Sequence, residues 1–484
     1  MAAPHLERQL GLGACISIVV GAIIGSGIFM KPAVMAGQVG SPFILLLVWV
    51  VAGIVSLFGG MINAEVGTVL PKTGGQYIYF QHMYGNFFAF LYGWAAFVVI
   101  NTAAIAAIAF VFAQYTQYFV QLPRFSAETE QLIRLTIPGI GHLYPLENFG
   151  VKVVAIIVIV LLSTINYVSL KAGSTVQVFF TVIKIGSLLL LAGIIFFSGN
   201  GSTENFFHTD PSVKKTGWEM VLGFIAATSG ALAAYDGWNN LGFVAGEIKN
   251  PRQNIPRGLV IGLLICITMY VLTNQAYLYM LPVQEMKDAG LVASDALNKV
   301  MAVTGGGLIA AMVIISTFGA VNGSVLPCAR IQFAMGREGY FFKAIGKVHP
   351  KYHTPGNALL LQMIWACLFV LTGSFDMLTD VFVFVTWLFY GFAAYGLFIL
   401  RKKMPDAQRA YKVWGYPFVP VIFILFATFY FFLTLYNDIS SYLNREKEFI
   451  NSAYGLILTI LGIPLYWYFK KRKKIQLHDT VPVE

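Results

Sequence analysis

Two glycine-containing interruptions of apolar segments supply backbone groups that can bind a small charged molecule. The first interruption, Gly25-Ser26-Gly27, falls within the apolar residues 11–30. Glycine allows a helix to unwind, because it has no Cβ to restrict the backbone. Unwinding here would leave the N–H groups of Ser26, Gly27 and Ile28 without helical partners, beside the positive end of a half-helix. These groups would suit a carboxylate.

The second interruption lies in residues 218–244 and contains Ser229-Gly230 and Asp236-Gly237. Carbonyl groups freed near residues 231–235 would lie at the negative end of another half-helix and would suit an ammonium group. A zwitterionic amino acid would therefore satisfy both interruptions. The alternative is that these glycines only allow helices to pack closely, as small residues do in membranes.

Two ionisable residues, Lys184 and Asp236, lie deep in apolar segments. A charged side chain at the centre of a membrane helix costs roughly 2.5 to 3.5 kcal/mol, so we expect both to have a function. Lys184 could replace a coupling cation by placing its ammonium among carbonyls and hydroxyls, with Ser316 and Thr317 as partners. The alternatives are a structural ion pair, or a lysine whose amine reaches the membrane interface.

The carboxylates near these segments each have a functional and a structural interpretation. Asp236 could pair with a cationic or dibasic side chain of a substrate, or it could cap a half-helix that begins at Gly237. Glu65 and Glu247 lie near the inner ends of their segments, close to basic residues that include Lys72. They predict ion pairs at an inner gate or in loops.

The composition indicates that lipid surrounds most of the chain. Hydrophobic residues make up 57% of it and charged residues 11%, with a mean hydropathy of +0.72, which excludes an ordinary soluble domain. Windows of about 20 apolar residues predict twelve membrane-spanning helices and hence an all-α membrane fold. The predicted spans are residues 11–36, 42–69, 86–120, 150–168, 174–198, 218–246, 255–281, 305–335, 357–373, 377–400, 416–436 and 450–469.

The distribution of Lys and Arg predicts that both termini lie in the cytoplasm. With that orientation, 21 of the 32 Lys and Arg residues fall in inner loops and the tail, 9 fall outside, and Lys31 and Lys184 remain within the membrane. Cytoplasmic loops carry such an excess. The net charge of +10 then faces anionic lipid, and we expect no nucleic-acid partner.

Interruptions in the first and sixth spans predict two inverted repeats of five helices, followed by two further helices. Paired broken helices are typical of secondary transporters, whose substrate site lies at the breaks. The predicted division is residues 1–200 for the first repeat, 201–403 for the second, and 404–484 for the last two helices and a basic cytoplasmic tail.

The cysteines and histidines indicate neither metal binding nor catalysis. The four cysteines lie in or at the edge of predicted spans without a C-x-x-C pair, and the seven histidines lie at chain ends or in loops. We therefore expect no metal, no cofactor, no structural disulfide and no enzymatic activity. A channel, which would need a continuous lined pore, and an amino-acid sensor are the alternatives to a transporter.

Short motifs lie at the two breaks, near the ends of the second and sixth spans, and within and just after the eighth span. They are Val20–Phe29, Ala64-Glu65 with Pro71–Gly75, Ala234–Asn239 with Glu247–Pro251, Asn322-Gly323-Ser324, and Arg337-Glu338-Gly339. Over most of the chain, these motifs together resemble the amino acid, polyamine and organocation transporters. Within that superfamily the chain is similar to the L-type amino-acid transporter group, including its bacterial exchangers of small neutral amino acids.

The resemblance implies an inverted-repeat fold of the LeuT type and obligatory, sodium-independent exchange of amino acids. It places the substrate between the Gly25–Gly27 amides and the carbonyls of the sixth span. Lys184 matches the lysine of the fifth span, whose amine is thought to replace a sodium ion in this group, and Thr386 matches a polar specificity position in the tenth. The expected substrate contacts are Ile23, Gly25, Ser26, Gly27, Ile28, Ala233, Ala234, Asp236, Asn239 and Thr386.

Two departures from the family pattern bear on the cargo. Ala233 replaces a bulky aromatic gate, and Asp236 replaces the glycine of carriers for large neutral amino acids. An aspartate here resembles members that also accept dibasic amino acids, and small-neutral exchangers of bacterial type. The loop after the third span lacks the cysteine by which animal relatives join a glycoprotein, so we expect no disulfide-linked heavy chain.

The sequence therefore predicts an amino-acid exchanger of the cell membrane that works by alternating access. Small neutral amino acids such as serine, alanine or threonine are the expected cargo. A wider exchange that includes cationic amino acids through Asp236 is the alternative.

Overall fold

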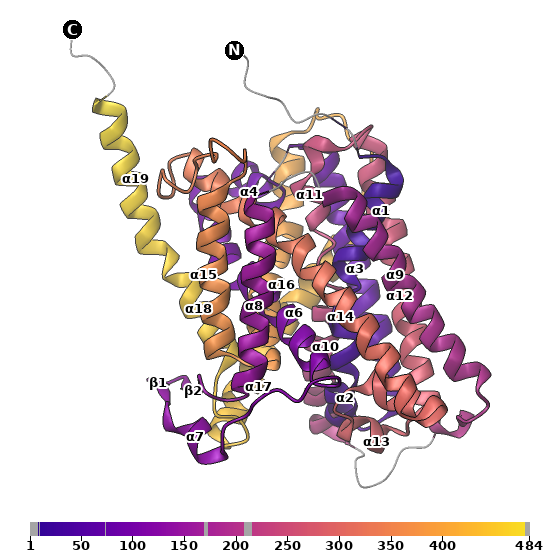
Figure 1. Ribbon diagram of the computed structural model, residues 1–484. Coiled ribbons are helices and arrows are strands. Elements are labelled where there is room, and N and C mark those ends of the chain that lie inside the picture. The colour runs from indigo at the N-terminus through magenta and orange to yellow at the C-terminus, as the bar shows by residue number, and fades with distance from the viewer. Residues whose placement is uncertain (1–7, 9, 73, 169–172, 208–214, 480–484) are drawn as a thin grey trace.

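The chain folds into a bundle of long helices that run between two ends of the molecule (Figure 1). This computed structural model describes residues 8, 10–72, 74–168, 173–207 and 215–479. The first helix starts and the last helix ends at the same end (Figure 1), which we call the terminal end. The other end, which carries the short hairpin, is called the opposite end.

The first half of the described chain contains the first break, between its first two helices. Its helices are α1 (Leu12–Ile23), α2 (Gly27–Val39), α3 (Pro42–Val69), α4 (Gln76–Tyr84), α5 (Asn86–Ala95), the π-helix η1 (Ala96–Asn101), α6 (Thr102–Thr116), α7 (Ala127–Leu132), α8 (Phe149–Val168) and α9 (Gly173–Phe197). A hairpin of β1 (Leu135–Ile137) and β2 (Gly141–Leu143) pairs Leu135 with Leu143 in antiparallel register.

The second half of the described chain contains the second break. Its helices are the 3-10 turn η2 (Thr203–Phe206), α10 (Gly217–Tyr235), α11 (Asn240–Phe243), the 3-10 turn η3 (Ala245–Glu247), α12 (Pro251–Met280), α13 (Val283–Asp288), α14 (Val292–Arg337), α15 (Gly356–Thr372), α16 (Phe375–Lys403), α17 (Phe418–Leu443), α18 (Asn451–Ile460) and α19 (Gly462–Asp479). The second break lies between α10 and α11.

The twelve predicted spans all correspond to helices in the described part of the chain. Ten helical stretches are long and apolar enough to cross a membrane, and α1 with α2 forms a further span bent by 41°. The ninth predicted span is α15, an apolar helix of 17 residues. The fold is thus the expected all-α membrane protein, with the small hairpin as the addition that the sequence did not reveal.

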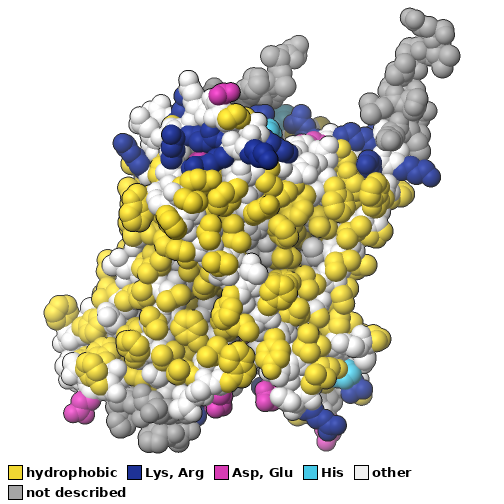
Figure 2. Space-filling view, turned by 180° about the vertical axis from the view of Figure 1, so that it is seen from behind, with side chains coloured by type: hydrophobic (Ala, Val, Ile, Leu, Met, Phe, Trp, Pro, Cys, Tyr) yellow, Lys and Arg dark blue, Asp and Glu magenta, His cyan; other side chains and the backbone are white. Residues whose placement is uncertain are grey.

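The surface of the bundle is suited to contact with the lipid of a bilayer. Apolar side chains cover the band between the two ends, and Lys and Arg side chains gather at the terminal end (Figure 2). Large apolar side chains such as Phe197 and Phe432 are 93% and 63% exposed, which water would disfavour but lipid accepts. On the face that Figure 2 shows, the basic side chains therefore lie mostly at one rim.

Two local predictions are wrong. Ser229-Gly230 does not interrupt a helix, because α10 continues through both residues to Tyr235. A Cβ on Gly230 would lie 3.1 Å from Met35 Cγ and 3.5 Å from Lys31 Cδ, so this glycine serves close packing of α10 on α2. The close-packing interpretation therefore applies at this position.

The sequence of residues 282–304 also predicts one amphipathic helix with Ser294 as its N-cap, and this prediction is wrong in part. The segment holds α13 and then the first turns of α14, which run on into the eighth span. Leu291 precedes α14, and its N–H donates to Asp295 Oδ2. Ser294 is therefore not the N-cap that the sequence predicted, and its hydroxyl donates instead to the carbonyl of Gly306.

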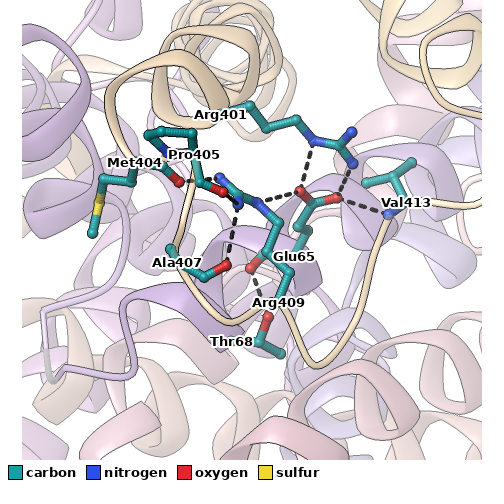
Figure 3. A network of polar contacts seen from close by, with 8 residues as sticks. All are labelled: Glu65, Thr68, Arg401, Met404, Pro405, Ala407, Arg409 and Val413. Atoms are coloured by element: carbon teal, nitrogen blue, oxygen red, sulfur yellow. Dashed lines mark hydrogen bonds and ion pairs between the residues drawn. The ribbon is translucent and has the colours of Figure 1, made fainter.

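The carboxylate of Glu65 joins three chain segments at the terminal end (Figure 3). It is fully buried and accepts two hydrogen bonds from Arg401, at 2.8 and 2.6 Å, and one from the N–H of Val413 at 2.8 Å. Arg409 Nε lies 3.4 Å from Glu65 Oε1. The expected ion pair exists, but its partners come from the end of α16 and the following loop rather than from Lys72, because distant segments pack there.

Further motif residues meet at the same end. Arg330 pairs with Glu247 at 2.9 Å, and Tyr77 donates to Glu338 at 2.6 Å. The N–H of Leu10 donates to the carbonyl of Glu247 at 3.0 Å. These contacts tie the segment before α1, η3, α4 and the end of α14 together at the terminal end.

We expect Glu65→Gln to destabilise the protein by about 3 kcal/mol, because it leaves two arginines around a neutral amide. The measurement is thermal unfolding of the purified protein in detergent. Glu247→Gln is the matched control, since both partners in its pair with Arg330 are about one-fifth exposed and such pairs contribute about 1 kcal/mol or less. Equal losses of stability in the two variants would contradict the account.

Candidate functional site

The first break separates α1 from α2 and leaves amides unpaired. The helix ends at Ile23 and starts again at Gly27. Within the described part of the chain, the N–H groups of Ser26, Gly27 and Ile28 make no hydrogen bond, and the next N–H, of Phe29, donates to the Ser26 carbonyl at 3.1 Å. A helix N-terminus of this kind attracts an anion.

The second break follows Tyr235, the last residue of α10. Asp236 is extended and Gly237 has a φ of +114°, a conformation that favours glycine. The chain becomes helical again only at Asn240. A Cβ on Gly237 would lie 3.0 Å from the carbonyl carbon of Ala22, so this break packs against α1.

The two breaks touch each other directly. A Cβ built on Gly27 would lie 2.6 Å from Ala234 Cβ and 2.7 Å from Ala234 Cα. Only glycine fits there. Tyr270 of α12 joins the breaks a second time, because its hydroxyl lies 2.7 Å from the Ile23 carbonyl and 2.9 Å from the Ala234 carbonyl. No sequence pattern indicates that a tyrosine would bridge these two helix ends.

A cavity of about 80 Å³ lies between the breaks. Its walls come from both broken spans and from η1, α6, α14 and α16. Seven of the ten predicted contact residues line it: Ile23, Gly25, Ser26, Gly27, Ala233, Ala234 and Asp236. Their contact with a substrate stays a prediction.

Three predicted contact residues do not line this cavity. Ile28 is fully buried in the core. Asn239 does not line the cavity, but its neighbour Asn240 does. Thr386 lies one turn beyond Phe382 along α16, and its buried hydroxyl has no hydrogen-bond partner among the described residues. In α16 the wall is formed instead by Phe375, Thr379 and Phe382. Thr386 thus lies nearer the terminal end than the wall residues of α16, and its contact with a substrate stays a prediction.

Several polar side chains of the cavity wall were not predicted as site residues, among them Lys31 and Asn101. Asn101 ends the π-helix η1, and its buried side-chain nitrogen has no hydrogen-bond partner in the described chain. Single π-turns in α-helices are frequent at functional sites, but the sequence does not reveal them. Lys31 was detectable, because a lysine within an apolar span is as costly as Lys184.

Lys184 reaches the first broken helix and not the eighth span. Its ammonium is 1% exposed and donates to the Gly21 carbonyl at 2.8 Å. The proposed partners in α14 are not engaged: Thr317 donates to the Val313 carbonyl of its own helix, and the Ser316 hydroxyl is unpaired within the described residues. Its burial excludes an amine at the membrane interface. The ion-pair alternative also lacks support in the described chain, where no carboxylate lies within 4.0 Å of this amine.

Asp236 faces α16 across the second break. Tyr390 donates to Asp236 Oδ1 at 2.8 Å. The capping interpretation is wrong in the form predicted, because no helix begins at Gly237 and Asn239 is the residue before α11. In the described chain, Asp236 and Lys31 are the charged side chains that line the cavity.

Comparison with known proteins agrees with this architecture. Residues 10–461 match the family model described as amino acid permease. The serine/threonine exchanger SteT of Bacillus subtilis (strain 168) is 34% identical over 471 residues, which are 97% of this chain and 98% of that protein. The b(0,+)-type amino acid transporter 1 of Homo sapiens is 31% identical, covering 96% of this chain and 88% of that protein. The human cystine/glutamate transporter is 30% identical, covering 96% of this chain and 86% of that protein.

These matches span nearly the whole chain and include both breaks. The relatives are transporters and not enzymes, as the absence of a catalytic cluster in the sequence predicted. The chain therefore belongs to the amino acid permease family, within the superfamily of amino acid, polyamine and organocation transporters and beside its L-type group.

Proposed function

We propose that this protein exchanges small neutral amino acids, such as serine, threonine and alanine, across the cell membrane without sodium. The observation that carries the proposal is the cavity between the unpaired amides at Gly27 and the broken end of α10. The bacterial relative SteT is a serine/threonine exchanger, which supports the same cargo.

The cavity suits a zwitterion. The carboxylate of the amino acid would accept from the N–H groups of Ser26, Gly27 and Ile28 at the positive end of α2. Its ammonium would donate to the carbonyls of Ala233 and Ala234, since a carbonyl accepts two hydrogen bonds and the one at Ala234 holds only Tyr270. Alanines of α6 leave room for a short side chain.

Lys184 would serve in place of a coupling cation. Its ammonium holds the Gly21 carbonyl, four residues before the first break, so it acts on the orientation of α1 rather than on the substrate. A resident positive charge at this place removes the need for a bound sodium ion. In this proposal Ser316 and Thr317 are neighbours that could join the contact in another conformation.

Alternating access would move the two repeats, residues 1–200 and 201–403, against each other while residues 404–484 stay as an appendage. We place both termini in the cytoplasm, since Lys and Arg gather at the terminal end (Figure 2). The four cysteines all lie in helices, so the proposed transporter works without a disulfide-linked heavy chain.

The cargo is tested by competition in proteoliposomes. Uptake of labelled serine into vesicles loaded with serine is measured while unlabelled amino acids are added outside. Serine, threonine and alanine should inhibit at least about tenfold more strongly than leucine or arginine, a difference of 1.4 kcal/mol in binding. Stronger inhibition by leucine than by alanine would reject the small-neutral cargo.

The alternative of wider cargo rests on Asp236, the one carboxylate in the cavity wall of the described chain. If the wider cargo holds, Asp236→Asn should weaken inhibition by arginine about tenfold, because a hydrogen bond to a charged group contributes about 1.5 to 3 kcal/mol. Tyr390→Phe is the control, since it removes the hydrogen bond to Asp236 and keeps the charge. Arginine inhibition that is unchanged in Asp236→Asn would exclude the wider cargo.

A further inference from the structure

Lys31 places a buried positive charge in the wall of the cavity. It lies one helical turn beyond Gly27 in α2, on the face that carries the unpaired amides. The residue is 3% exposed, and its stem packs over Gly230 of α10. Its ammonium lies 2.6 Å from Asp376 Oδ1 and 4.7 Å from the centre of the Phe375 ring.

The two side chains of the Lys31–Asp376 ion pair differ in their exposure. The side chain of Asp376 is 55% exposed at the start of α16, whereas that of Lys31 is 3% exposed. Water screens the carboxylate on its open side, but little water screens the ammonium toward the cavity. Asp376 does not line the cavity. Asp380, a second carboxylate of α16 that interacts electrostatically with Lys31, does not line the cavity either. A substrate there would therefore meet the positive charge more directly than these negative ones.

The described wall of the cavity thus holds one cation, Lys31, and one anion, Asp236. Lys31 extends from α2 toward the opposite end, and Asp236 lies at the second break. A zwitterion with a neutral side chain adds no charge to this pair. A cationic side chain would add a charge that Lys31 repels, and an anionic one would be repelled by Asp236.

We propose that Lys31 is a specificity-determining residue, which excludes amino acids with cationic side chains by opposing Asp236 within the cavity. This inference rests on the proposed exchange function. It accounts for how a cavity that contains Asp236 can still prefer neutral amino acids. It also assigns Asp376 the role of holding Lys31 in place.

The competing interpretation is a purely structural ion pair that ties α2 to α16. The two interpretations differ in what they expect of the two partners. Removing either partner breaks a structural tie equally, so Lys31→Met and Asp376→Asn would then have the same effect. A charge in the cavity makes the two substitutions act in opposite directions.

The experiment measures uptake of labelled serine into serine-loaded proteoliposomes. Unlabelled arginine or glutamate is added as competitor. For each variant, inhibition by the competitor is compared with inhibition by unlabelled serine. Lys31→Met should lower the arginine concentration for half-inhibition by about tenfold or more, because Asp236 is then unopposed. Asp376→Asn should not strengthen inhibition by arginine and should strengthen inhibition by glutamate. Lys31→Arg keeps the charge and should still exclude arginine.

The double variant Lys31→Met with Asp236→Asn should lose the gain for arginine, since neither charge remains. Equal competition profiles for Lys31→Met and Asp376→Asn would overturn the proposal. If Lys31→Met does not fold, Lys31→Gln replaces it. The thermal stabilisation of each purified variant by arginine or by serine then gives the same comparison. Absence of serine exchange in the wild-type protein would instead reject the proposed function.

Discussion

Lys184→Ala should reduce amino-acid exchange about 10- to 100-fold while the protein stays folded. The substitution removes a hydrogen bond from a charged donor to the Gly21 carbonyl, an interaction of about 1.5 to 3 kcal/mol. If this contact sets the orientation of α1 during exchange, the loss appears in the transport rate. The measurement is serine exchange per folded transporter in proteoliposomes, with folding checked by gel filtration and thermal unfolding. Lys184→Met repeats the test with less change in volume.

Lys152 provides the matched control. It is as buried as Lys184, at 2% exposure, and its ammonium donates to the carbonyls of Tyr144, Pro145 and Leu371 at 2.8, 3.3 and 3.0 Å. None of these residues lines the cavity. Lys152→Met should therefore lower stability and leave the exchange rate of the folded protein near wild type. Wild-type exchange from well-folded Lys184→Ala would remove its coupling role.

Gly27→Ala should abolish exchange to below about 1% of the wild-type rate. The added Cβ would lie 2.6 Å from Ala234 Cβ and 2.7 Å from Ala234 Cα, so α2 and α10 would have to move apart. Overpacking of this kind costs about 1 to 3 kcal/mol, and a displacement near 1 Å at a binding site can cost about 100-fold in rate. The same exchange assay measures the effect.

Gly13→Ala is the control for this substitution. Gly13 lies in the same broken span, within α1, and a Cβ there would meet nothing within 4 Å. Alanine also favours a helix over glycine by about 1 kcal/mol. Gly13→Ala should therefore exchange serine at the wild-type rate with equal or higher stability. Similar activity of the Gly27 and Gly13 variants would mean that the contact between the breaks is not required.

The spans were predictable because lipid requires long apolar helices, which appear in the sequence as apolar segments of about 20 residues. The first break was predictable because Gly25 and Gly27 leave the helix weak at one point. Ser229-Gly230 was not, since the same residue types serve unwinding in one context and close packing in another. Only the neighbouring helix α2 decides between them.

The same limit applies to the site residues. The burial of Lys184 follows from its apolar surroundings in the sequence, but its partner depends on how α9 packs against α1, so Gly21 replaced the predicted Ser316 and Thr317. Asn101 enters the cavity wall at the end of a π-helix, which has no sequence signature. The bridge from Tyr270 to both breaks likewise requires three helices to meet.

The most direct test of obligatory exchange uses proteoliposomes loaded with labelled serine in sodium-free buffer. Efflux is measured with serine, leucine, arginine or no amino acid outside. The account predicts rapid efflux with external serine, weaker efflux with leucine and arginine, and almost none into empty buffer. Equal efflux into empty buffer would show a uniporter or channel, and would contradict the account.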